Sequence, residues 1–161
     1  MKDVLLKRLI VTGSSWSMLP IRLVVGTVFF AHGAQKLLGW FGGGGLSGTA
    51  HLFEARLNLF PGFLWTFLAG GAEFFGALLV CAGLLTRLGA SIIGVVMAVA
   101  IWKVHLGAFF NPQGVEFPLS LLASSCALAV YGGGRWSVDR AMLRPELRPG
   151  GANLETKSGT G

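Results

Sequence analysis

Four long apolar runs dominate this chain and constrain what it can fold into. They cover Leu19–Leu38, Pro61–Leu85, Leu88–Phe110 and Phe117–Tyr131. A helix needs about 20 predominantly apolar residues to cross the hydrocarbon core of a bilayer, so three runs are long enough and the fourth is short. Of the 161 residues, 53% are hydrophobic and 12% are charged, against about 25% charged in a soluble domain. The pattern predicts an all-α fold, a membrane-embedded four-helix bundle.

The positions of the basic residues predict the orientation of this bundle. If the helices alternate in direction, ten of the 13 Lys and Arg fall on the side of the two termini, and Lys36, Arg56 and Lys103 fall on the other. Cytoplasmic segments of membrane proteins carry an excess of basic residues. We therefore expect both termini in the cytoplasm. The net charge of +6 is then a topology signal with some attraction to anionic lipid, and no nucleic-acid-binding face is expected.

The first run has a second interpretation. The segment Ala31-His32-Gly33-Ala34 resembles the small-residue cleavage site of a signal peptide. Cleavage there would leave three runs and place the basic C-terminal segment outside the cell. Because that arrangement would break the charge asymmetry, we favour an uncleaved first helix.

The sequence divides into three parts. Residues 1–18 form a cytoplasmic N-terminal segment, 19–134 hold the four helices, and 135–161, rich in Pro, Gly and Arg, form a flexible cytoplasmic tail. Between the first two runs, the glycines at 42–45 predict a flexible outer loop, and residues 49–57 predict a short interfacial helix. Cys81 and Cys126 fall inside apolar runs, so we expect buried thiols; whether they meet stays open.

Ionisable residues inside the apolar runs are the candidate functional residues, because a charge at the bilayer centre costs at least ~2.5 to 3.5 kcal/mol. Glu73 lies about 18 Å from the outer end of the second helix, near mid-membrane. On the first helix, His32, Gln35 and Lys36 recur at i, i+3 and i+4 and form one polar stripe. Near the outer ends of the last two helices the sequence places Lys103 and Glu116. We expect a polar pocket that opens outward, with Glu73 as its deepest member.

Each candidate also has a purely structural interpretation. Lys36, Lys103 and Glu116 could reach the interface or cap helices, and His32 could hold two helices together, whereas Glu73 is too deep to reach water. Carboxylate, imidazole and amine groups at the edge of an apolar bundle can bind a quinone head group and deliver protons to it. The same groups could bind a transported solute or a partner protein. The three histidines and two cysteines have no metal-site spacing, so we expect no metal.

Several motifs together resemble one family of membrane proteins. This sequence resembles the DoxX family, small four-helix membrane proteins named after a subunit of a thiosulfate:quinone oxidoreductase. The matching segments are Arg22-Leu23, His32-Gly33-Ala34-Gln35-Lys36-Leu37, the loop Gly42–Gly45, Glu73-Phe74-Phe75-Gly76, Gly83-Leu84-Leu85-Thr86-Arg87, Gly114-Val115-Glu116 and Gly132-Gly133-Gly134-Arg135-Trp136-Ser137-Val138-Asp139.

The resemblance implies a multi-pass protein of the bacterial inner membrane. It would act as a subunit of a redox complex that passes electrons from a sulfur or thiol donor, through a partner protein, to membrane quinone. On this hypothesis Glu73 and His32 are the catalytic, proton-handling residues, and Gln35, Lys36, Lys103 and Glu116 bind quinone or an anionic donor. Lipid and redox proteins are the expected partners, and a homo-oligomer is compatible with the sequence. The alternative is a non-enzymatic scaffold or small-solute carrier, which the lack of a cofactor motif or C-x-x-C pair favours.

Overall fold

The described part of the chain is helical throughout. The computed structural model describes residues 10–13, 15–110 and 114–142, and no strand occurs among them. The all-α prediction is therefore confirmed for this part of the chain. The helices, in chain order, are α2 (Met18–Leu38), the 3₁₀ turn η1 (Trp40–Gly42), α3 (Gly45–Leu57), α4 (Gly62–Ala82), α5 (Thr86–Ala100), the π-helix η2 (Ile101–His105), α6 (Glu116–Tyr131) and α7 (Val138–Met142).

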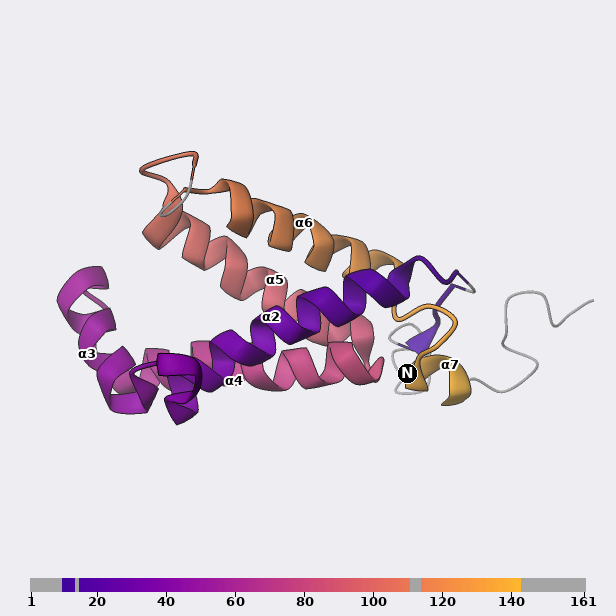
Figure 1. The fold of residues 1–161 in the computed structure, drawn as a ribbon, viewed down its shortest axis with the longest axis horizontal. Helices are drawn as coiled ribbons and strands as arrows, with labels where there is room; N and C mark the ends of the chain where they lie inside the picture. The colour runs from indigo at the N-terminus through magenta and orange to yellow at the C-terminus, as the bar shows by residue number, and fades with distance from the viewer. Residues whose placement is uncertain (1–9, 14, 111–113, 143–161) are drawn as a thin grey trace, which may run out of the picture.

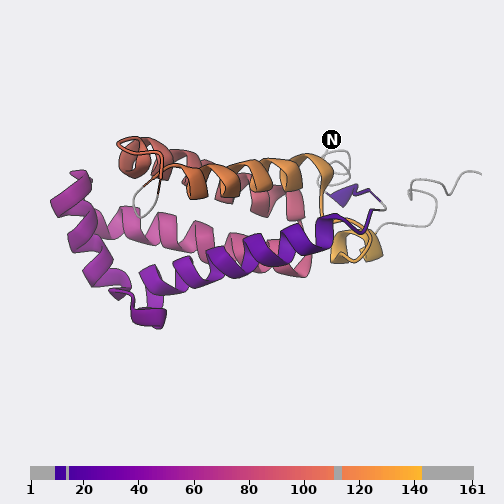
Figure 2. The same cartoon turned by 45° about the horizontal axis from the view of Figure 1, so that its top comes forward.

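The long helices lie along one another in two layers. Figure 2 shows α5 and α6 in one layer and α2 and α4 in the other. The layers diverge toward the end that carries α3 and converge near α7 (Figure 1). Contacts join α2 to α4, α4 to α5, α5 to α6 and, less extensively, α2 to α6. Both ends of the described chain therefore lie near α7, opposite to α3.

Two of these helical segments have the length and composition of a membrane span. They are Gly62–Ala82, which is α4, and Thr86–His105, which combines α5 and η2. α6 is apolar but shorter, with 16 residues. α2 has 21 residues, but Arg22, His32, Gln35 and Lys36 lower its hydropathy. Membrane-like helices are thus present, although they number two by this criterion rather than the predicted four.

Helix boundaries differ most from the prediction at two places. The interfacial helix begins at Gly45, four residues before the predicted Thr49, so one of the loop glycines opens a helix. The third helix ends at His105 rather than Phe110, and its last five residues are in π conformation. The apolar run 106–110 is thus longer than the helix it predicted, because hydrophobicity alone does not mark where helical hydrogen bonding stops.

Glycines allow the helices to approach closely. A Cβ atom on Gly33 of α2 would lie 2.5 Å from the backbone nitrogen of Phe74 in α4. A Cβ atom on Gly89 of α5 would lie 3.0 Å from the carbonyl oxygen of Gly76 in α4. Small residues at helix crossings let backbones pack directly on one another. α4 is therefore held closely between α2 and α5, which places its midpoint, including Glu73, inside the molecule.

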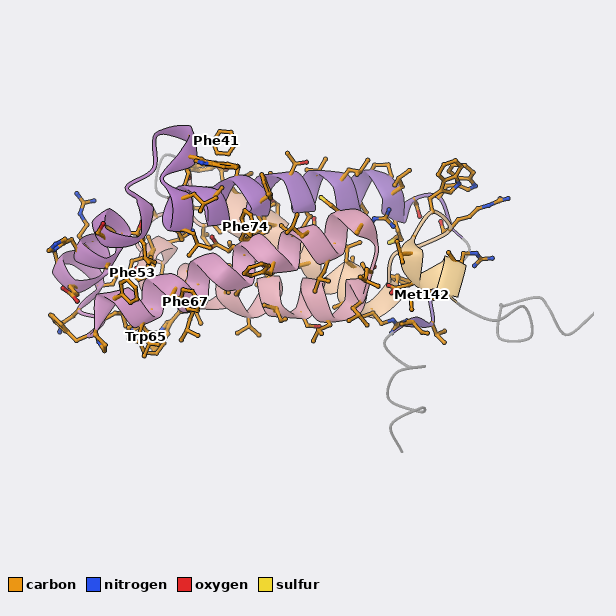
Figure 3. The ribbon with its side chains drawn as sticks, turned by 90° about the horizontal axis from the view of Figure 1, so that it is seen from below. Phe41, Phe53, Trp65, Phe67, Phe74 and Met142 are labelled. Atoms are coloured by element: carbon orange, nitrogen blue, oxygen red, sulfur yellow. The ribbon has the colours of Figure 1, made fainter. Side chains whose placement is uncertain are left out.

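Large apolar side chains also cover the outside of the helices. Trp65 and Phe67 project from the outer side of α4 (Figure 3), and both are exposed. Val95 and Val99 of α5 and Val130 of α6 are exposed as well. A surface of this kind is typical of a protein that contacts lipid or a partner. The expectation of two buried thiols is wrong for Cys126, which lies exposed on α6, whereas Cys81 is partly buried; both are free.

Candidate functional site

An ion pair between α2 and α4 lies at the centre of the candidate site. Lys36 Nζ donates a hydrogen bond to Glu73 Oε2 at 2.5 Å. The side chain of Glu73 is 5% exposed and that of Lys36 is 22% exposed. A buried carboxylate needs a partner, because taking its charge out of water costs several kcal/mol. Lys36 is that partner, and Glu73 has no other hydrogen-bond partner in the described part of the chain.

Glycines on α2 and α4 bring the lysine to the carboxylate. A Cβ atom on Gly70 would lie 3.1 Å from Lys36 Cβ, so the stem of the lysine rests on the surface that this glycine leaves open. Gly33 makes room for Phe74 one helical turn earlier on α2. Phe74 in turn packs its ring 4.9 Å from that of Phe30. The pair is therefore held in position by close helix packing on both sides.

His32 is the third member of the site. It lies one helical turn before Lys36 on the same helix, a spacing at which side chains are neighbours. Its side chain is exposed, and no hydrogen bond of His32 is found among the described residues. The predicted polar stripe on α2 is therefore split: Lys36 points inward to α4, whereas His32 lies at the edge of the pair, where a ligand or lipid would meet it.

The remaining predicted site residues lie outside the Lys36–Glu73 hydrogen bond. Gln35 Nε2 donates to the carbonyl oxygen of Phe41 at 3.2 Å and so holds the η1 turn. Lys103 is exposed on η2, with Nζ 4.3 Å from the centroid of the Trp102 ring. Glu116 is the first residue of α6. None of the three hydrogen-bonds to Glu73. Within the described residues, no group of three His, Cys, Asp or Glu side chains is placed to hold a metal ion.

A second set of buried polar residues lies at the opposite end of the molecule. We call it the basal cluster; it consists of Thr12, Arg22, Thr86, Ser137 and Asp139. Asp139 accepts hydrogen bonds from the backbone nitrogens of Leu85 and Thr86 at 2.6 and 3.0 Å, and from Thr86 Oγ1 at 2.9 Å. A carboxylate there satisfies the free N–H groups at the start of α5 and lies at the positive end of the helix dipole.

Arg22 fills the rest of the basal cluster. Its guanidinium donates to the carbonyl oxygens of Gly133 at 2.6 Å and Trp136 at 2.5 Å. Gly83 makes room for it, since a Cβ atom there would lie 2.6 Å from Arg22 Nη1. Thr12 accepts a hydrogen bond from the backbone nitrogen of Gly134 at 2.6 Å. The cluster thus ties the N-terminal segment, α2, the α4–α5 turn and the segment after α6 together.

The sequence prediction did not find the basal cluster. Arg22 is one of the ten basic residues on the predicted cytoplasmic side, and Asp139 lies in the predicted flexible tail. Residues 135–142 instead pack on the helices and end in α7, while 143–161 lie outside the described residues. One signal was present: Gly132–Gly134 ends five residues before Asp139, and glycines are used where the backbone must approach another group closely. Here they let carbonyl groups reach Arg22.

The comparisons with known proteins agree with the sequence resemblance. A protein of Haemophilus influenzae described as an "Uncharacterized protein" is 28% identical over 129 residues, which cover 79% of this chain and 83% of that protein. "Putative oxidoreductase CatD" of Bacillus subtilis is 32% identical over 114 residues, which cover 71% of this chain and 78% of that protein. No solved structure matches the chain. The DoxX family pattern matches residues 17–106, from the start of α2 through η2, and the chain therefore belongs to the DoxX family.

Proposed function

We propose that the chain crosses the bacterial inner membrane four times, with both termini in the cytoplasm. α2 and α6 would join the two longer apolar segments as spans. Three observations support this topology: the packing of α2 and α6 along α4 and α5, the exposed apolar side chains on their outer faces, and the excess of basic residues in the sequence segments that alternating helices assign to the side of the termini. An accessibility assay on cysteines introduced at Ser15 and Ser47 tests it: only the second should react from outside intact cells.

Within that membrane, we infer that the protein serves quinone-linked redox chemistry as a subunit of a complex. The single observation that carries this proposal is the Lys36–Glu73 pair, a carboxylate and an amine kept inside an apolar molecule with one hydrogen bond between them. Such groups can exchange protons with a ligand where water is scarce. The similar Bacillus subtilis protein bears the name of an oxidoreductase, which is consistent with this role.

Reduction of a quinone requires protons at its two oxygens, and this gives the pair its task. Two thiols and one quinone yield a disulfide and a quinol; two thiosulfate ions, one quinone and two protons yield tetrathionate and a quinol. In both cases the quinone oxygens take up two protons as two electrons arrive from the donor. Glu73 and Lys36 would supply protons from the interior, and His32 would relay them from the edge of the site. Gln35, Lys103 and Glu116 would act farther out, at the entry for quinone or an anionic donor.

The second candidate function is a non-enzymatic scaffold or small-solute carrier. One observation favours it: the Lys36–Glu73 pair joins two helices, and a buried pair can fix helix register without any chemistry. The two candidates differ in what happens when the charges are removed together. A scaffold should tolerate a well-packed apolar replacement, whereas a proton-handling site should not.

The test is quinone reduction with thiosulfate or a thiol as donor. It should be measured both on the purified protein in lipid and on membranes of a host that supplies partner subunits. Glu73→Gln keeps the shape of the side chain but cannot titrate, and we expect it to lower turnover about 100-fold or more. Glu54→Gln is the matched control, since Glu54 lies outside the pair on α3. Equal turnover in the Glu73→Gln and Glu54→Gln variants would favour the scaffold or carrier. So would a lack of turnover both in the purified protein in lipid and in the host membranes.

A further inference from the structure

A groove at the α7 end has the residues of an anion-binding site. It has a volume of about 770 Å³ and is lined by Ala82 at the end of α4 and by residues of the 135–141 segment. Arg135, Trp136 and Arg140 are the large side chains in this lining. Arg135 and Trp136 are exposed, and Arg140 is partly exposed. The groove therefore offers two guanidinium groups and an indole ring at the surface.

Asp139, the carboxylate closest in sequence to the lining residues, is turned away from the groove and does not reduce its positive charge. Asp139 lies between the lining residues Val138 and Arg140 but is only 1% exposed, and its oxygens are bound to Leu85 and Thr86. None of the described lining residues is acidic. The buried charges of Arg22 and Asp139 offset one another, so Arg135 and Arg140 leave a local charge of about +2.

Neutral groups hold both arginines. The guanidinium of Arg135 lies 5.4 Å from the centroid of the Trp16 ring, and that ring packs 5.2 Å from Trp136. Arg140 Nη1 donates to the carbonyl oxygen of Gly13 at 3.4 Å. Neither contact neutralises a guanidinium. Arginines prearranged in this way can still offer paired N–H groups to a phosphate.

The position of the groove identifies the occupant. α2, α4 and α6 all end or begin at this end of the molecule, and Trp16 and Trp136 are exposed beside the groove. Tryptophans at the ends of spans lie at the depth of lipid head groups. Resting on the membrane placement proposed above, we infer that the groove binds the head group of an anionic phospholipid. The phosphate would lie between Arg135 and Arg140, and the glycerol and first acyl carbons would lie against Trp136.

The test uses native mass spectrometry to measure how much phosphatidylglycerol and how much phosphatidylcholine the full chain binds. Two guanidinium contacts should favour phosphatidylglycerol by about tenfold or more. The variant Arg135→Gln with Arg140→Gln should lose this preference. Arg56→Gln with Lys103→Gln, which removes the same charge at the α3 end, should keep it. Arg135→Lys with Arg140→Lys, which keeps the charge but not the paired donors, should fall between.

Three outcomes would overturn the inference. The first is an equal preference for phosphatidylglycerol in the double glutamine variant and in the α3-end control. The second is displacement of the lipid by inorganic phosphate alone, which would assign a site for a free anion. The third is displacement by an acidic peptide but not by soluble phosphatidylglycerol, which would assign a protein-docking surface. Quinone reduction is measured separately, so failure here leaves the redox proposal unaffected, and failure there leaves this one unaffected.

Discussion

The buried carboxylates in the two charged regions of this molecule differ in how many hydrogen bonds they accept. In the basal cluster, both oxygens of Asp139 accept hydrogen bonds, three in all, and Arg22 donates to two carbonyl groups. In the central site, Glu73 and Lys36 have one hydrogen bond between them. Both sites join α2 to another part of the chain, and both are enclosed by close glycine contacts. Their packing is alike, and their hydrogen bonding is not.

This difference separates a structural role from a chemical one. A carboxylate that accepts three hydrogen bonds from the backbone and a hydroxyl cannot bind a ligand without breaking some of them. A carboxylate with one hydrogen-bond partner has acceptor capacity left for a ligand. We therefore assign Asp139 to folding and Glu73 to function, and the two assignments can be tested by substitution.

Removing the basal carboxylate should have the largest effect on stability. Asp139→Ala leaves the nitrogens of Leu85 and Thr86 without their acceptor and Arg22 without its nearby opposite charge. Loss of one member of a buried charged network costs about 3 to 5 kcal/mol. We expect little folded protein and a large fall in Tm, measured by thermal unfolding in detergent. Leu85 adds to the effect, since its left-handed conformation (φ 46°) loses the bond that holds it.

Asp139→Asn is the control for this variant. The amide keeps an oxygen that can accept from one backbone nitrogen, so part of the stability should remain. A Tm for Asp139→Ala equal to that of the unmodified protein would contradict the structural role of the basal cluster. In that case its hydrogen bonds would not distinguish it from the central site.

Breaking the central pair should lower stability less than Asp139→Ala does, and it should lower activity more. Lys36→Met removes one hydrogen bond, whereas Asp139→Ala removes three, so we expect a loss of about 2 kcal/mol. Adding Glu73→Leu should recover at least half of that loss, because an apolar pair of similar volume can replace a buried ion pair. Unfolding measurements on the single and double variants give this comparison.

Turnover measurements on the same variants complete the test. All variants that lack Glu73 or Lys36 should be inactive in quinone reduction, including the double variant that regains stability. A double variant that is stable and active would remove the distinction between the two regions, since Glu73 would then hold helices together and nothing more.

Close packing beside the central pair can be tested by substituting one glycine of α2 and, as a control, one glycine of α4. Gly33→Ala places a Cβ atom 2.5 Å from the Phe74 nitrogen, so α2 and α4 must move apart. We expect a loss of about 1 to 2 kcal/mol in unfolding free energy and a weakened ion pair. Gly71→Ala on α4 is the control, because a Cβ atom there meets nothing within 4 Å. Equal Tm values for the two variants would show that the helix crossing is not close at Gly33.

The sequence predicts local features well and long-range pairings poorly. Apolar runs placed the start of α2 and the end of α6 within one residue, and depth in the second run identified Glu73 as a residue in need of a partner. Spacing on one helix grouped His32, Gln35 and Lys36, but the 3.6-residue period does not say which of them meets α4. Arg22 and Asp139 are 117 positions apart, and only the folded chain brings Asp139 to the start of α5.

The smallest expected effect on stability is for a third carboxylate, Glu54. Because Glu54 caps a helix without being buried, its substitution separates the effect of capping from the effect of burial. Glu54 Oε1 accepts from the backbone nitrogen of Gly62 at 2.7 Å, so it caps α4 as Asp139 caps α5. Glu54 is partly exposed, however, and water can replace it at the helix end. We therefore expect Glu54→Ala to cost about 0.5 to 1 kcal/mol, the usual range for a helix cap, and Glu54→Gln to cost less. If Glu54→Ala lowered Tm as much as Asp139→Ala does, capping alone would explain the basal cluster, and its burial and its contact with Arg22 would add nothing.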